Sequence, residues 1–406
     1  MDFIYRIERK YVLIFVFITT ILTSIVGQLP FVSLLSSAIL VLFGFYIIYL
    51  KIKYRISFPV PNLPLLLLIL ILSISIIMSM DYSFGIKILI FTGLQFFILS
   101  SGYKYSSFDI SVSLIRLFNV FISLVSILTF IGLLLYFIGV SFDYGDLRYV
   151  TFYNGSFSGL YLNPNTTGIV SYMALAFLYY KSIVSHKKSY FLFFLHLTAL
   201  LLSSSRSAIL SLMLLFFVYK YIVMKRKIYK ILILLLAFGF IAICAVYWET
   251  IMDSMASLFN KAESDISNGR FMLWTYAFQV IQEHPLWGVG RGNFENTFLE
   301  LDPQLEYSGL MGGGLHNFYI QTATIYGCSF LFALLFFFIS IFRIKIQKTT
   351  DDKYCLLVFV KSFLLSLCFL NFFESNILFV LNIVTTFFWI FIGILLLPQS
   401  GVKYIS

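Results

Sequence analysis

Long apolar segments recur along the whole sequence and limit what this chain can fold into. A helix of about 20 apolar residues crosses a hydrocarbon core about 30 Å thick while it satisfies its own backbone hydrogen bonds. Since 60% of the 406 residues are hydrophobic and 11% are charged, a water-soluble globular protein is excluded. The sequence predicts one all-α integral-membrane domain, 1–406, with about twelve transmembrane helices. The twelve segments are about 11–27, 31–50, 63–80, 83–100, 114–139, 166–184, 189–204, 207–223, 228–247, 316–342, 354–373 and 376–397.

The distribution of basic residues predicts the orientation of these spans. If the N-terminus is cytoplasmic, the cytoplasmic segments carry 20 of the 28 Lys and Arg residues and the opposite segments carry five. Cytoplasmic loops of membrane proteins are enriched in Lys and Arg, so both termini are predicted to be cytoplasmic. The same bias accounts for the net charge of +10 without a nucleic-acid partner. The first apolar run has no small-residue cleavage site, which predicts a retained span.

One hydrophilic stretch, 248–315, is far longer than the others and lies between the ninth and tenth predicted spans. The alternation of spans places it on the extracytoplasmic side. It carries nine carboxylates against three Lys and Arg residues. Its helical patterning and its Gly and Pro residues predict a folded loop, and loops of this length are often functional.

Arg206 lies in a run of serines between two apolar segments, at the predicted outer surface. An arginine that snorkels to the interface is one explanation. The other is an anion site, because Ser204 and Ser205 supply hydroxyls and the next helix begins there with free N–H groups. Arg270 presents a similar choice, since it follows Asn268 and Gly269 in the first turn of a predicted helix. An arginine there opposes the helix dipole unless an anion joins it; a salt bridge to a loop carboxylate is the alternative.

Glycines 288, 290 and 292 surround Arg291 and resemble a loop that cradles phosphate. The full nucleotide-binding pattern and its strand context are missing. A tight turn packed against the membrane surface is therefore the favoured interpretation.

His316 and Asn317 open the tenth span after a run of three glycines. A histidine there is well placed to accept a proton or to bind a phosphate, although a purely structural histidine is equally compatible. Asn163 and Asn165 flank Pro164 at the entry to the sixth span. They suit a helix cap, and hydrogen bonding to a sugar or phosphate is the further possibility. No His, Cys, Asp or Glu cluster has a convincing spacing, so no metal is predicted.

Together, two arginines, a histidine and an amide-rich turn are predicted at one outer face. A forked guanidinium matches phosphate geometry, and attraction to an anion within about 4 Å is of order 4 kcal/mol at an effective dielectric of about 20. The predicted ligand is a lipid-linked pyrophosphate in the outer leaflet.

The ordered motifs of residues 160–330 resemble those of the O-antigen ligase/polymerase family. The resemblance implies a GT-C-like glycosyltransferase of the bacterial inner membrane that uses undecaprenyl-diphosphate-linked oligosaccharide without a metal or other cofactor. The motifs are Asn163-Pro164-Asn165 with Gly168, Ser204-Ser205-Arg206-Ser207-Ala208, Gly269-Arg270 with Trp274 and Pro285, Gly288-Val289-Gly290-Arg291-Gly292-Asn293-Phe294, and His316-Asn317 with Gly327.

By position, the resemblance implies that Arg206 and Arg270 bind the donor pyrophosphate and that His316 deprotonates or orients the acceptor hydroxyl. Asn163, Asn165, Ser204, Ser205, Arg291 and Asn317 are the expected substrate-binding residues. The family includes polymerases, which extend a lipid-linked chain, and ligases, which transfer it to the lipid A core. We expect a polymerase of O-antigen or capsule, with a ligase as the alternative and a flippase or transporter as a further one. Membrane lipids, a chain-length regulator and a flippase are the expected partners.

Overall fold

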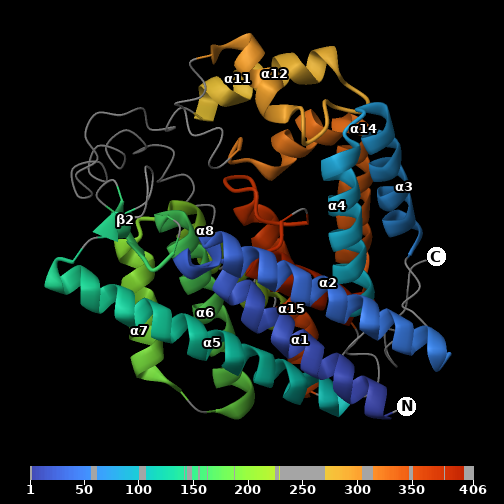
Figure 1. Ribbon diagram of the computed structural model, residues 1–406. Coiled ribbons are helices and arrows are strands. Elements are labelled where there is room, and N and C mark those ends of the chain that lie inside the picture. The colour runs from blue at the N-terminus through green and yellow to red at the C-terminus, as the bar shows by residue number, and fades with distance from the viewer. Residues whose placement is uncertain are drawn as a thin grey trace.

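The computed structural model describes residues 2–55, 62–99, 107–140, 142–143, 149–153, 156–161, 163–186, 188–224, 228, 270–303, 314–346, 351–378 and 380–396. These ranges are mostly helical. Figure 1 shows two short helices, α11 and α12, lying together at one end of the molecule, away from the N-terminus. The helices are α1 Asp2–Leu22, α2 Pro30–Lys53, α3 Leu63–Met78, α4 Tyr82–Leu94, α5 Ser107–Ile138, α6 Pro164–Ser185, α7 Tyr190–Leu202, α8 Arg206–Val223, α11 Arg270–Glu283, α12 Phe294–Leu301, α14 Phe318–Arg343, α15 Asp351–Leu370 and α16 Ile383–Leu396, with a 3₁₀ turn η1 Ile25–Gln28 and a π-helical turn η2 Gln95–Leu99.

Eleven of the twelve predicted spans fall on helices. The ninth, 228–247, lies outside the described residues except for Ile228, so the count of twelve stays a prediction. Six described helices are long and apolar enough to cross a membrane, and five shorter ones are apolar as well. The chain is therefore a multi-pass membrane protein. One boundary differs from the prediction: the described residues 371–378 and 380–382 between α15 and α16 are non-helical, whereas the sequence predicted a break of only two residues there.

Asparagine side chains fix where several helices begin. The Asn163 side-chain oxygen accepts a hydrogen bond from the backbone N–H of Thr166 at 2.8 Å, and Pro164 occupies the first helical position of α6. The Asn317 oxygen accepts from the N–H groups of Tyr319 and Ile320 at 3.0 Å at the start of α14. Such caps satisfy helix N–H groups that have no partner within the helix.

Aromatic packing around α6 fixes the helices that lead to the site. Phe177 of α6 stacks on Phe118 of α5 with ring centroids 4.1 Å apart, and it contacts Phe363 of α15 and Phe387 of α16 at 5.2 and 4.6 Å. All four rings are buried. Aromatic pairs at these separations stabilise a core beyond the area they bury, so α5, α6, α15 and α16 form a rigid frame.

A small sheet departs from the all-α expectation. Its strands are β1 Phe142–Asp143, β2 Tyr149–Tyr153 and β3 Ser156–Gly159, paired antiparallel in that order. β3 is buried and packs against α5 and α6, where the Thr167 hydroxyl donates to the Ser158 carbonyl. Alternating aromatic and β-branched residues in β2 favour a strand, but the segment is too short to be distinguished from a loop in sequence.

α14 bends at Gly327, whose backbone adopts φ 83° and ψ 165°. At the bend, backbone groups of α14 form hydrogen bonds with the segment after α11. The N–H groups of Val289 and Gly290 donate to the carbonyls of Thr324 and Ile325 at 3.1 and 2.9 Å, and the Cys328 N–H donates to the Pro285 carbonyl at 2.8 Å. The loop and the helix are therefore joined by backbone hydrogen bonds.

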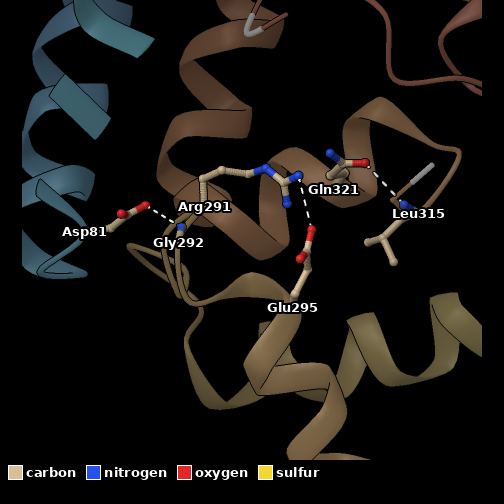
Figure 2. A network of polar contacts seen from close by, with 6 residues as sticks. All are labelled: Asp81, Arg291, Gly292, Glu295, Leu315 and Gln321. Carbon is tan, nitrogen blue, oxygen red and sulfur yellow. Dashed lines mark hydrogen bonds and ion pairs between the residues drawn. The ribbon is translucent and has the colours of Figure 1, made fainter. Parts of the chain in front are cut away.

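The glycine repeat is part of this joint. Gly288 and Gly290 have φ of 67° and 82°, a backbone conformation that glycine adopts without steric cost. A Cβ on Gly288 would lie 2.5 Å from the Ile325 carbonyl. The Gly292 N–H donates to the Asp81 carboxylate at 2.6 Å, at the start of α4 (Figure 2). The turn thus packs against protein helices, whereas the sequence favoured packing against the membrane surface.

Candidate functional site

Five chain segments that are distant in sequence meet at the end of the molecule where α11 lies. A Cβ on Gly168 would lie 2.3 Å from the Ser205 Cβ, so the beginnings of α6 and α8 are in direct contact. The Phe318 N–H at the start of α14 donates to the carbonyls of Asn371 and Glu374 at 2.9 and 3.0 Å. The Arg270 Nη1 at the start of α11 donates to the Phe373 carbonyl at 3.3 Å.

Arg206 and Arg270 lie close enough to interact electrostatically. The pKa of Arg270 is lowered, mainly by burial and also by the positive charge of Arg206, while Glu374 acts in the opposite direction. Within the described part of the chain, Arg206 has no carboxylate within 4 Å. Two neighbouring guanidinium groups with a single carboxylate beside them make a net positive site, which suits a dianionic ligand.

Glu374 is the member of the site that sequence reasoning missed. Its side chain is only 7% exposed, and its Oε1 has no hydrogen-bond partner within the described part of the chain. Burial raises its pKa to about 7, against the opposing influence of Arg270. A signal was available, because Glu374 is the only charged residue between Lys361 and Lys403. A lone carboxylate between two apolar segments costs free energy, so its presence there indicates a function.

His316 lies beside Arg270 in a strained backbone conformation. Its φ is 49°, which is uncommon for a residue other than glycine and is found most often at functional sites. Its pKa is lowered to about 4, first by burial and second by the charge of Arg270. At neutral pH the imidazole is therefore uncharged, and it can donate or accept a hydrogen bond.

Two hydrogen bonds hold Leu315, the residue before His316, in place. The Trp274 Nε1, one turn along α11 from Arg270, donates to the Leu315 carbonyl at 2.8 Å. The Leu315 N–H donates to the Gln321 side-chain oxygen at 3.2 Å, as Figure 2 shows. Trp274 thus links α11, which carries Arg270, to the loop that carries His316.

Replacing Trp274 with phenylalanine tests this link. The change removes the N–H donor and keeps an aromatic ring, so it should cost about 1 kcal/mol of stability. We expect the rate of the reaction at this site to fall about tenfold, since small displacements of a reacting group are costly. Tyr276→Phe is the matched control. Tyr276 lies on the same helix as Trp274, and the change deletes its hydrogen bond to Asp302 at the end of α12. Equal rates for the two variants would contradict the positioning role of Trp274.

The serine turn before α8 is also strained. Ser204 has φ of 53°. Ser203 Oγ donates to the Leu200 carbonyl at 2.7 Å and accepts from the Ser205 N–H at 3.4 Å. Ser205 Oγ lies 3.5 Å from Ser207 Oγ. These contacts fix the turn that precedes Arg206, and substrate binding by Ser204 and Ser205 stays a prediction.

Of the other predicted binding residues, Asn163, Asn317 and Arg291 have structural partners. Asn163 and Asn317 cap α6 and α14, and Asn165 is half-buried in the first turn of α6. Arg291 pairs with Glu295 at 3.5 Å and lies over the Phe294 ring at 5.4 Å. No contact among the described residues joins Arg291 to the cluster of Arg206, Arg270, His316 and Glu374, which we call the polar cluster.

Residues 191–338 match the Wzy_C family model, which is described as O-Antigen ligase. This stretch of the chain is similar to the O-antigen ligase family. The matched stretch spans Arg206, Arg270 and His316, and it ends before Glu374. The resemblance inferred from the motifs is thus confirmed, and the family comprises ligases and polymerases, whose activity is of the glycosyl-transfer type. No curated protein matches the chain.

Proposed function

We propose that this protein is a polysaccharide polymerase of the plasma membrane. It transfers an undecaprenyl-diphosphate-linked glycan to the hydroxyl of a second lipid-linked repeat unit. The observation that carries this proposal is the pair of arginines, Arg206 and Arg270, which approach each other inside the stretch that is similar to the O-antigen ligase family, with Glu374 as the neighbouring carboxylate. Such a pair suits the diphosphate that the donor carries at its anomeric carbon.

The basic residues support an outward-facing site. Lys220 lies in the last turn of α8 and Arg343 in that of α14. α8 and α14 begin at the polar cluster, so Lys220 and Arg343 lie at the opposite end of these two helices. Because Lys and Arg mark the cytoplasmic side, the polar cluster faces the extracytoplasmic side.

The chemistry follows from the charges of the polar cluster. As the bond from the anomeric carbon to the diphosphate breaks, negative charge grows on the departing oxygen, and Arg206 and Arg270 stabilise it. The acceptor hydroxyl attacks the opposite face of the carbon, and the configuration inverts. A neutral His316 orients that hydroxyl, because an imidazole with a pKa of about 4 is a weak base at pH 7.

The donor chemistry is the same in a ligase, and the description of the matched domain as O-Antigen ligase makes a ligase the second candidate. Purified protein in lipid nanodiscs, given a synthetic undecaprenyl-diphosphate repeat unit as sole substrate, should produce a ladder of chain lengths on a gel. Transfer only after addition of a lipid A core acceptor would make the protein a ligase. Absence of both products, with movement of the lipid-linked substrate across the bilayer, would overturn the glycosyltransferase proposal in favour of a flippase.

A further inference from the structure

We propose that Glu374 is the catalytic base, whose Oε1 takes the proton of the acceptor hydroxyl while His316 only orients that hydroxyl. This inference rests on the proposed function, because it assigns a step of the same glycosyl transfer. Glu374 takes up the proton and His316 orients the hydroxyl, two roles that His316 would otherwise have to combine.

The first argument is the fixed position of the carboxylate. The Asn371 side chain donates to the Leu367 carbonyl at 2.8 Å and accepts from the Asn376 N–H at 2.8 Å, which closes the turn around Glu374. The Phe318 N–H bonds the Glu374 carbonyl at 3.0 Å. Phe318 is two residues from His316, so the turn with the carboxylate and the loop with the imidazole are tied together.

The second argument is the unused hydrogen-bonding capacity of Oε1. This oxygen is buried and has no hydrogen-bond partner among the described residues. A buried carboxylate oxygen without a partner costs free energy, and such groups are few in native proteins. A substrate hydroxyl would supply the missing donor.

The third argument is the sign of the charge that each candidate base acquires. A proton on His316 would create a cation beside Arg270 of α11, which is coupled to Arg206 of α8. A proton on Glu374 neutralises a buried anion, which removes its desolvation cost. The pKa of Glu374, raised to about 7, also matches a base that works near neutral pH.

The step balances as follows. The acceptor oxygen forms a bond to the anomeric carbon of the donor, and the bond from that carbon to the diphosphate oxygen breaks. The electron pair of the broken bond leaves with undecaprenyl diphosphate, between Arg206 and Arg270. The hydroxyl proton passes to Glu374 and then to water, which restores the carboxylate.

The test uses the full-length protein in nanodiscs, with the synthetic lipid-linked repeat unit at saturating concentration. Glu374→Gln keeps the shape of the side chain but cannot take up the proton, and Glu374→Asp keeps the carboxylate. Glu283→Gln is the matched control, since Glu283 is an exposed carboxylate at the far end of α11. Transfer rates are measured from pH 5.5 to 8.5, and binding of undecaprenyl diphosphate alone is measured in parallel.

We expect Glu374→Gln to lower the transfer rate by about 100-fold or more while binding undecaprenyl diphosphate within about threefold of the natural chain. The natural chain should lose activity below about pH 7 as the carboxylate becomes protonated. That inflection should vanish from the residual activity of Glu374→Gln, persist in His316→Gln, and return with partial activity in Glu374→Asp.

Three results would overturn the inference and leave the proposed function standing. They are a Glu374→Gln rate within about threefold of the natural chain, a loss of diphosphate binding equal to the loss of transfer, and an inflection that His316→Gln abolishes instead. If the natural chain transfers no glycan to either acceptor, the proposed function itself fails.

Discussion

Alanine at Arg206 will lower glycan transfer by about 1,000-fold and leave the protein folded. One arginine within about 4 Å of an anion contributes attraction of order 4 kcal/mol at an effective dielectric of about 20, and each 1.36 kcal/mol of lost transition-state stabilisation is about tenfold in rate. The thermal unfolding midpoint should stay the same or rise slightly. Arg206 repels Arg270 and has no carboxylate within 4 Å among the described residues.

The measurement is the initial rate of transfer from the lipid-linked repeat unit, together with unfolding in detergent. Arg206→Lys keeps the charge but loses the forked geometry, so we expect an intermediate rate. Arg343→Ala, at the opposite end of α14, is the charge-matched control and should be as active as the natural chain. If Arg206→Ala transfers glycan at the rate of the natural chain, Arg206 and Arg270 do not act together in the reaction.

Alanine at Gly327 will destabilise the fold by about 2–3 kcal/mol or more. At φ 83° and ψ 165°, a conformation that is essentially restricted to glycine, a side chain costs about 1–3 kcal/mol in backbone strain. The new Cβ would also lie 2.1 Å from the Leu286 carbonyl oxygen and 2.5 Å from the Trp287 nitrogen. These are backbone atoms, so a rotamer change cannot relieve the clash, and the hydrogen bonds around the bend must break.

The expected result is a large loss of monodisperse protein on detergent extraction and a lower unfolding midpoint for what remains. Gly93→Ala is the matched control, because a Cβ there meets nothing within 4 Å and alanine favours a helix over glycine. If Gly327→Ala unfolds at the same temperature as Gly93→Ala, the bend is not held as the structure indicates.

The positions of the membrane helices were predictable, because apolar length is a local signal. The capped start at Asn163 was predictable for the same reason, since a cap is recognised within four residues, whereas Asn317 was expected only as a substrate-binding residue and also caps α14. The bend at Gly327 was not, because its hydrogen bonds join it to Pro285 and Gly290, far away in the chain. β1–β3 were not predicted either, since their pairing with one another leaves little trace in such short segments.

The polar cluster shows the same division. Arg206, Arg270 and His316 were singled out because each is anomalous in its local sequence. Glu374 was overlooked because it lies in the gap between two apolar segments, and its importance depends on Arg270, which is about a hundred residues away. Arg291 has an equally suggestive sequence context, but the structure pairs it with Glu295, four residues along the chain, which is a spacing that the sequence already shows.

The hydrogen bonds between the glycine turn and α14 limit insertions and deletions in the segment between Arg270 and Gly290. Arg270 is tied to the Phe373 carbonyl at one end of α11, and Val289 and Gly290 are tied to α14 beyond the other. One residue inserted within α11 would turn Arg270 by about 100° about the helix axis relative to that second anchor. The number of residues between Arg270 and Gly290 therefore fixes the orientation of Arg270. Functional variants should accept many substitutions in this segment but no insertion or deletion.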